Sequence, residues 1–313
     1  MPNYTLTEVR EHTYKARDSW WTVFLVDPLA GRLVVWTANR TAITPNQLTL
    51  GAALLGLTSA VCFALGSWPW LLAGALLFHL SFVLDCMDGK IARLKDTGTV
   101  FGMWVDFVLD RVRFFGCMGA LLVGQWLVTG SVVYLLLAPV VIFVDLMRYL
   151  NGSQVAKTRR VMRERLRVAT AEQSEQTAPV SEEATSPDNG EPTPQDPGDA
   201  ASDVVLVEEQ RNVEEPSRPA TLVEIGRRNY RRIRAKLRHR RVRPHLFSGI
   251  EFEMFVCVVA PATAVLWVLG VPSLIVAIVV FACAALTMFE LLIIYRLWVA
   301  TRRFGEKMRQ LSH

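Results

Sequence analysis

Four aspartates in one short stretch of the sequence have the type and spacing needed to hold divalent cations. The stretch reads DCMDGKIARLKDTGTVFGMWVDFVLD and runs from Asp85 to Asp110. Residues three or four positions apart share one face of a helix, so Asp85 and Asp88 would share one face and Asp106 and Asp110 another. A short turn around residues 96–98 would let both faces point their side chains at one place.

Carboxylates clustered in an apolar setting are costly unless cations compensate them. Hard oxygen ligands of this kind suit Mg²⁺ or Mn²⁺, and these ions in turn favour phosphate oxygens as further ligands. Gly89, Ala92 and Gly102 fall on the same faces and carry little or no side chain, which leaves room for a nucleotide. Arg93 can offset phosphate charge. The stretch therefore predicts a metal site for a diphosphate substrate.

The chain around this stretch is organised in long apolar runs. Hydrophobic residues make up 51% of the 313, and no Asp, Glu, Lys or Arg lies between Arg40 and Asp85. That run is far longer than the roughly 20 residues of one bilayer crossing. Gly, Pro and two Trp residues at 66–70 predict a turn at the interface. We therefore predict two spans here, the first starting at Thr44-Pro45-Asn46.

Two further pairs of spans follow. The apolar run after Arg113 is broken near Gly130 and reaches Val144, and a last pair occupies residues 247–270 and 272 to about 299. The predicted fold is an all-α polytopic membrane bundle of six transmembrane helices with an N-terminal interfacial amphipathic helix. An even number of spans places both termini on one side.

The position of the basic residues predicts the orientation of the bundle. The formal net charge is +5, and Lys and Arg cluster beside the spans at 157–167, 227–243 and 302–307. By the positive-inside rule these segments are cytoplasmic, and anionic lipids attract them. An integral protein of the cell inner membrane with a site facing the cytoplasm is expected. No nucleic acid partner is expected, because Tyr230 is the only aromatic beside the basic segment near Arg227.

Four regions are expected along the chain. Residues 1–40 mix apolar and charged residues and suit a helix lying in the membrane interface. Residues 41–150 hold the first four spans and the acidic stretch, and residues 246–313 hold the last two spans and a cytoplasmic tail. Residues 151–245 form a cytoplasmic insert with basic arms and an acidic centre, about 170–220, whose composition is typical of disorder. A passive tether is the simpler interpretation of this insert, and charge-based regulation is the alternative.

The acidic stretch also resembles a known signature. The spacing D-x2-D-G-x2-A-R-x8-G-x3-D-x3-D matches without a gap that of the CDP-alcohol phosphotransferases. The eight fixed positions are occupied by Asp85, Asp88, Gly89, Ala92, Arg93, Gly102, Asp106 and Asp110. The chain is similar to this family in its six predicted spans, its N-terminal helix and the Pro-Asn start of span one. The acidic insert lies outside the resemblance.

The resemblance implies an enzyme that moves a substituted phosphoryl group from a CDP-linked donor to an alcohol and releases CMP. It implies a two-metal site for Mg²⁺ or Mn²⁺ that binds the diphosphate. Asp110 would be a further ligand or the general base that takes the acceptor's proton. Because relatives form homodimers through their membrane helices, a homodimer is expected. The implied metal ligands are Asp85, Asp88, Asp106 and Asp110, and the implied nucleotide contacts are Asp85, Gly89, Ala92, Arg93 and Gly102.

The substrates are less well defined. CDP-diacylglycerol with glycerol phosphate or inositol phosphate is the expected pair, and a soluble CDP-alcohol with a lipid acceptor is the alternative. Arg111 and Arg148 are candidates for binding an anionic acceptor. Structural roles compete with this interpretation, because Arg148 can snorkel or pair with Asp145, and Arg113 can pair with an aspartate of the signature. His79 is expected to be a hydrogen-bonded residue of a span.

Two other functions compete with the transferase. A transporter also carries acidic residues inside a helical bundle, but here the acids gather at one cytoplasmic edge and do not line a path through the midplane. A membrane scaffold without catalytic activity would not need all eight signature positions, which are present. The transferase is therefore the preferred prediction.

Overall fold

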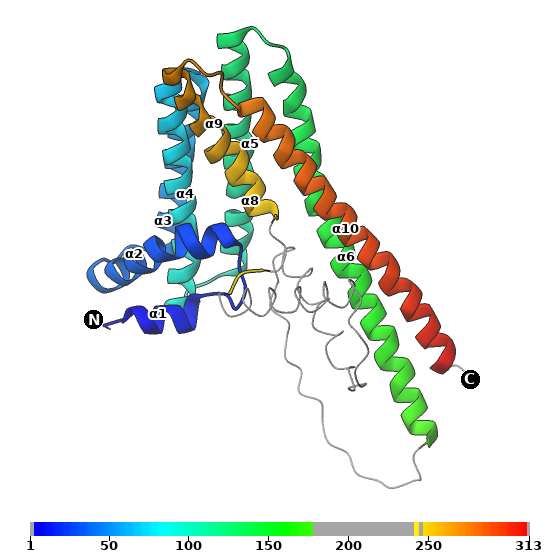
Figure 1. Ribbon diagram of the computed structural model, residues 1–313. Helices are drawn as coiled ribbons and strands as arrows, with labels where there is room; N and C mark the ends of the chain where they lie inside the picture. The colour runs from blue at the N-terminus through cyan, green and yellow to red at the C-terminus, as the bar shows by residue number, and fades with distance from the viewer. Residues whose placement is uncertain (1–2, 178–240, 244–246, 312–313) are drawn as a thin grey trace, which may run out of the picture. The chain divides into compact units, whose positions relative to one another are not determined.

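The computed structural model describes residues 3–177, 241–243 and 247–311 (Figure 1). Most of the predicted acidic insert and most of the basic stretch before span five lie outside these ranges. The described residues are largely helical and contain no β-strand. They form two compact units, one of residues 3–143, 241–243 and 247–286, and one of residues 144–177 and 287–311.

Six helices in the described ranges are long and apolar enough to cross a membrane, which confirms the predicted number of spans. The chain is therefore an all-α integral membrane protein. The spans are Pro45–Ala64 (α3), Trp68–Leu94 (α4), Val100–Thr129 (α5), the apolar part of Val133–Thr177 (α6), the irregular helix Gly249–Leu269, and Ile275–Leu311 (α10).

Two helices, not one, occupy the N-terminal region. They are α1 (Leu6–Thr13) and α2 (Asp27–Arg40), the second preceded by a π-helical turn, η1 (Thr22–Val26). The prediction of one helix over residues 1–40 is therefore wrong. The chain leaves the helical path because Asp18 forms a parallel β-bridge with Val242, with its N–H donating to the Arg241 carbonyl over 2.9 Å. The interfacial position of α1 and α2 stays a prediction.

The first span begins at the predicted signal. The Gln47 N–H donates to the Thr44 hydroxyl over 3.4 Å, and the Thr44 N–H donates to Gln47 Oε1 over 2.9 Å, which is a capping box. Pro45 follows at the first helical position, where no backbone donor is needed. After α3 the chain turns at Gly66, whose φ of +70° favours glycine. A Cβ there would lie 2.5 Å from Val128 Cγ2, so space also requires glycine.

Helix α3 packs against both α4 and α5 within the first unit (Figure 1). Small residues permit this close approach, since a Cβ at Gly74 would lie 2.6 Å from the Phe63 ring and one at Gly124 would lie 2.5 Å from the Phe63 carbonyl oxygen. Ser59 Oγ donates to the Gly74 carbonyl over 2.8 Å. The three helices thus form a close-packed frame for the α4–α5 connection, with a core that includes Phe63, Leu71, Phe78, Phe114, Met118, Leu121 and Leu122.

Helices α6 and α10 are longer than the apolar runs that predicted them. They have 45 and 37 residues, whereas the apolar runs end near Val144 and Val299. Both continue because the residues that follow, such as RRVMRERLRVATAE after Thr158, are strong helix formers. The boundary predicted at residue 150 therefore falls inside a helix. In the second unit Asn151 Nδ2 donates to Glu290 Oε2 over 2.6 Å and joins α6 to α10.

The fifth span is irregular along its length. It consists of α8 (Gly249–Met254), a π-helical turn η3 (Phe255–Val259), α9 (Ala260–Ala262) and a 3₁₀ segment η4 (Thr263–Leu269). Pro261 explains the change, because its ring removes one backbone donor and displaces the preceding turn. This span packs against α4 and α5 in the first unit.

Candidate metal centre

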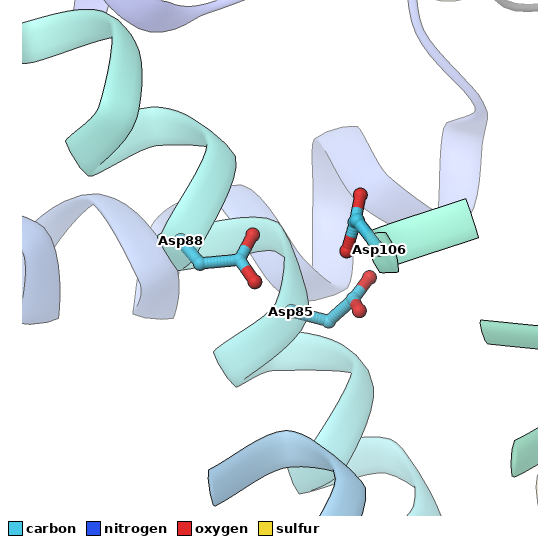
Figure 2. A group of neighbouring side chains, drawn as sticks. All are labelled: Asp85, Asp88 and Asp106. Carbon is cyan, nitrogen blue, oxygen red and sulfur yellow. The ribbon is translucent and has the colours of Figure 1, made fainter. Parts of the chain in front are cut away.

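Three of the four predicted metal ligands form a cluster where α4 meets α5. Asp85 and Asp88 lie about one turn apart on α4, and the Asp106 side chain on α5 points toward them (Figure 2). One carboxylate oxygen of each residue lies within 4.8 Å of the other two. The helix-turn-helix prediction is thus confirmed for these three side chains.

The connection between the helices makes this approach possible. It runs from Lys95 to Thr99, and Asp96 adopts a left-handed conformation with φ of 50°. Thr99 then caps α5, because its hydroxyl accepts the Gly102 N–H at 3.0 Å. A Cβ at Gly102 would lie 2.9 Å from this hydroxyl. A side chain at position 102 would therefore disturb this cap. The cap determines where α5 begins and thus where Asp106 lies one turn later.

The cluster fits a divalent cation. Asp106 Oδ1 is buried and has no hydrogen-bond partner among the described residues, although buried polar atoms normally have one. Asp88 Oδ2 accepts a hydrogen bond from Thr49 Oγ1 on α3, which fixes the orientation of that carboxylate. The potential ligands are all carboxylate oxygens, which suit Mg²⁺ or Mn²⁺. Zinc, in contrast, is typically bound by nitrogen and sulfur ligands.

Asp110 lies outside the three-residue cluster but is linked to it through Arg113. Arg113 Nη2 donates to Asp110 Oδ1 over 2.6 Å, and Nη1 donates to Asp85 Oδ1 over 3.1 Å. The alternative interpretation of Arg113 as an ion-pair partner of the signature is confirmed. Asp85 thus belongs both to the cluster and to this ion pair.

Three of the predicted nucleotide contacts, Gly89, Ala92 and Arg93, follow Asp88 on α4. At Gly89 a Cβ would meet only Arg93 Nη2, at an ordinary distance of 3.7 Å, so the backbone there is open. The Arg93 side chain is exposed and lies along the helix, with Nε donating to the Gly89 carbonyl over 2.9 Å. Ala92 is partly exposed. A nucleotide role for these residues and for Gly102 stays a prediction.

The two arginines predicted to bind an acceptor already have partners. Arg111 Nη2 donates to Glu253 Oε1 on α8 over 2.5 Å. Arg148 pairs with Asp145 at 3.5 Å, as the structural alternative predicted, and its guanidinium lies 4.0 Å from the Tyr149 ring centroid. His79 accepts a 3.5 Å hydrogen bond from Trp21 Nε1, which agrees with its predicted role as a bonded span residue.

A second charged cluster holds α4 on its other side. Lys90 Nζ lies 3.1 Å from Asp27 Oδ1, and Arg241 Nη1 lies 3.4 Å from Asp27 Oδ2. The Tyr14 hydroxyl donates to the Asp27 carbonyl over 2.9 Å, and burial raises the pKa of this phenol. Sequence reasoning missed this cluster, because its residues are far apart in the chain. Only the charge of Lys90 inside the apolar helix α4 could have signalled it.

The outer face of α5 beside Asp106 is apolar. Phe101 and Trp104 are 72% and 60% exposed, and their rings stack with centroids 5.9 Å apart. We call this surface the α5 aromatic stripe, and it consists of Val100, Phe101, Met103, Trp104 and Phe107. Acidic and apolar side chains therefore share the same turns of one helix.

These features define a class of protein, namely a polytopic membrane protein with an all-oxygen cluster suited to divalent cations and phosphates. Comparison with known proteins identifies the family. Residues 42–172 match the family model of the CDP-alcohol phosphatidyltransferases. This part of the chain, which contains the cluster, is similar to that family, and the predicted resemblance is confirmed.

Curated relatives match shorter parts of the chain. A phosphatidylinositol phosphate synthase of Corynebacterium glutamicum is 36% identical over 104 residues, which is 33% of this chain and 43% of the relative. A bifunctional IPC transferase and DIPP synthase of Aquifex aeolicus is 42% identical over 78 residues, 25% of this chain and 17% of the relative. An archaetidylinositol phosphate synthase of Methanothermobacter thermautotrophicus is 33% identical over 85 residues, which is 27% of this chain and 42% of the relative. The chain spans less than half the length of each of these relatives.

Proposed function

We propose that the protein transfers a phosphatidyl group from a CDP-linked donor to an alcohol, releases CMP and depends on divalent metal ions. The observation that carries this proposal is the cluster of Asp85, Asp88 and Asp106, in which one buried oxygen lacks a partner. The match of the surrounding residues to the CDP-alcohol phosphatidyltransferases supports the choice of a CDP-linked donor.

The residues divide the work between binding and proton transfer. Asp85, Asp88 and Asp106 would hold Mg²⁺ or Mn²⁺, which when bound neutralises the charge of the diphosphate and of departing CMP. Asp110 would take the acceptor's proton as the acceptor oxygen forms its bond to phosphorus and the bond to CMP breaks. The open backbone at Gly89 would let the nucleotide lie against α4.

The proposed substrates are CDP-diacylglycerol and a polyol phosphate. The names of the Corynebacterium and Methanothermobacter relatives support an inositol phosphate acceptor. Arg111 directly follows Asp110 on α5 and is the stronger of the two predicted anion contacts, and an anionic acceptor bound there would compete with its partner Glu253. Arg148 lies in the second unit, and its role in acceptor binding stays a sequence-based prediction. The same chemistry with a soluble CDP-alcohol and a lipid acceptor is the alternative.

We place the site at the cytoplasmic face of the inner membrane, because the basic segments beside the spans favour that orientation. The four predicted regions of the chain are kept, with the second boundary moved beyond the end of α6 at Thr177. A homodimer through the membrane helices is part of the proposal. Crosslinking in native membranes tests the dimer independently of activity.

The decisive experiment measures CMP release by the purified full chain. Native protein with CDP-diacylglycerol, inositol phosphate or glycerol phosphate, and Mn²⁺ or Mg²⁺ should release CMP, and chelation by EDTA should stop it. Asp106→Asn should lower kcat by at least about 100-fold, because removing one preorganised group that stabilises transition-state charge, such as an oxyanion-hole donor, costs roughly 2.7–4 kcal/mol of barrier. Mass spectrometry of the lipid product identifies the acceptor.

The matched control is Asp96→Asn, which makes the same change at an exposed residue of the adjoining turn. Asparagine also tolerates the left-handed conformation of that position, so this variant should keep native activity. CMP release that persists without divalent ions, or that Asp106→Asn leaves unchanged, would contradict the proposal. Flux of a solute through proteoliposomes without CMP release would favour a transporter.

A further inference from the structure

We propose that Arg113 is a positioning residue of this site. Its aliphatic stem passes α3 at Gly56, and its guanidinium holds Asp85 and Asp110 in a fixed relative orientation. This inference rests on the proposed function, because it assigns a role in the same reaction. It adds a residue that lies outside the eight signature positions.

The guanidinium joins two carboxylates that have different proposed tasks. Its two terminal nitrogens donate separately, Nη1 to Asp85 Oδ1 over 3.1 Å and Nη2 to Asp110 Oδ1 over 2.6 Å. Because the guanidinium is planar and its donors are fixed in a fork, both acceptor oxygens are set relative to one another. In each carboxylate the bonded oxygen is Oδ1. Because Oδ1 is held, this contact also fixes the direction in which Oδ2 points in Asp85 and in Asp110.

The Arg113 side chain is itself tightly constrained. It is only 4% exposed and lies against the Phe78 ring, with its Cζ 5.9 Å from the ring centroid. Nη1 also lies 3.4 Å from Ser81 Oγ, whose hydroxyl donates to the Ala52 carbonyl. Its stem crosses α3 at Gly56, where a Cβ would lie 2.6 Å from Arg113 Cγ and 2.8 Å from Cδ. Thus α3, α4 and α5 together determine the place of the guanidinium.

A permanent cation at this point also limits the repulsion among the four carboxylates. Arginine stays protonated in proteins, so Asp85 and Asp110 keep a counter-charge whatever else occupies the site. A buried arginine that only stabilised the fold could pair with any two acceptors. Its partners would not have to be aspartates of the proposed reaction centre. The geometry points to positioning because both partners belong to the signature.

The first test moves Arg113 without removing its charge. Gly56→Ala places a methyl group where the Arg113 stem now lies, and Gly51→Ala is the matched control on the same helix. At Gly51 a Cβ meets only Leu84 Cδ2 at an ordinary 3.5 Å. The full chain, purified in detergent, is titrated with Mn²⁺ by electron paramagnetic resonance, and kcat, KM and the unfolding midpoint are measured in parallel.

We expect Gly56→Ala to weaken Mn²⁺ binding and lower kcat by about 10- to 100-fold, the usual effect of disturbing a residue that orients a ligand. KM for the donor at saturating Mn²⁺ should change little, because Arg113 contacts the carboxylates and not the substrate. Gly51→Ala should behave as the native protein does. Native Mn²⁺ affinity and native kcat in a folded Gly56→Ala protein would overturn the proposal.

The second test asks whether Gly56 acts through Arg113. Arg113→Lys keeps the charge but cannot present two donors in a fixed plane, so it should give a loss similar to that of Gly56→Ala. Effects that act through one contact are not additive, so the double variant should be no worse than Arg113→Lys alone. Additive losses, or native behaviour of Arg113→Lys, would contradict the positioning role.

The outcomes separate the two proposals. A native protein that binds Mn²⁺ but releases no CMP would refute the proposed function, and the Mn²⁺ titrations would still decide the role of Arg113. A native protein that releases CMP, with variants that match it in both Mn²⁺ affinity and kcat, would refute the positioning role alone. A variant with a lowered unfolding midpoint but native kcat and Mn²⁺ affinity per folded molecule would show that Arg113 serves stability only.

Discussion

Asp88 is held by a hydroxyl that comes from another helix. Thr49 Oγ1 on α3 donates to Asp88 Oδ2 and also lies 3.1 Å from the Pro45 carbonyl of its own helix. A hydroxyl has one proton to donate, and a carboxylate is the stronger acceptor. The contact therefore orients the carboxylate from a residue 39 positions away in the chain.

Replacing this hydroxyl should weaken the site. Thr49→Val keeps the shape of the side chain and removes the donor, so we expect about 10- to 100-fold weaker Mn²⁺ activation of CMP release. Thr58→Val is the control, because Thr58 is exposed on the same helix and its hydroxyl donates to the Leu54 carbonyl of that helix. Equal Mn²⁺ dependence of the two variants would show that Thr49 has no part in the site.

At the residue scale, the sequence predicted the carboxylates better than their partners. Asp85, Asp88 and Asp106 could be grouped because helical spacing and one short turn determine which faces meet. The sequence does not identify Thr49 as a partner of Asp88. The packing of α3 on α4 depends on small residues whose contacts are not encoded in local spacing. The sequence indicates Arg113 as a partner of one signature aspartate, but its simultaneous contact with two of them depends on how α4 and α5 pack.

Among the elements, α4 is fixed on a second side by the pair of Lys90 and Asp27. Both side chains are less than a tenth exposed, and Arg241 shares the Asp27 carboxylate. Lys90 and Arg241 also lie 5.3 and 4.7 Å from the centre of the Tyr14 ring. The N-terminal helices and residues 241–243 are thereby joined to the helix that carries five of the eight signature positions.

Breaking this pair should destabilise the first unit. Asp27→Asn leaves Lys90 buried without its counter-charge, which typically costs roughly 3–5 kcal/mol. The measurement is thermal unfolding in detergent. The control is the double variant Asp27→Asn/Lys90→Met, which also removes the buried lysine charge and leaves only the partly exposed Arg241 without the Asp27 carboxylate, so much of the loss should be recovered. A single variant as stable as the native chain would mean that the pair contributes no stability.

The elements themselves were predicted unevenly. Six spans and their main turns follow from apolar run length and from Gly and Pro, because a bilayer fixes the length of a crossing. The ends of α6 and α10 do not follow, since helix-forming polar residues extend a helix beyond the apolar run. The break between α1 and α2 depends on the bridge of Asp18 to Val242, a contact between distant segments that local patterns cannot reveal.

For the whole molecule, the turns after α4 and α5 should lie on opposite sides of the membrane. The first is the Lys95–Thr99 connection beside the metal centre, and the second is the turn at Gly130, which has φ of 68°. One span, α5, separates them. The distribution of basic residues predicts that the first turn is cytoplasmic.

Labelling with a membrane-impermeant maleimide tests this orientation in intact cells. Ser131→Cys should react from outside, and Thr97→Cys should react only after the membrane is permeabilised. The native chain gives the background, because four of its five cysteines are buried. Labelling of Thr97→Cys in intact cells would place the metal centre on the outer face and contradict the proposed orientation.

If the donor is lipid-linked, the α5 aromatic stripe offers its acyl tails an apolar surface on the helix that carries Asp106. Phe101 and Trp104 face outward on the same turns from which Asp106 faces inward. Removing acyl tails from the bilayer costs about 0.8 kcal/mol for each methylene exposed to water, so complete extraction would be prohibitive. Tails lying along this stripe would leave the headgroup at the depth of the carboxylates. The donor could therefore arrive by lateral diffusion, and only its water-soluble partner and CMP would need an aqueous path.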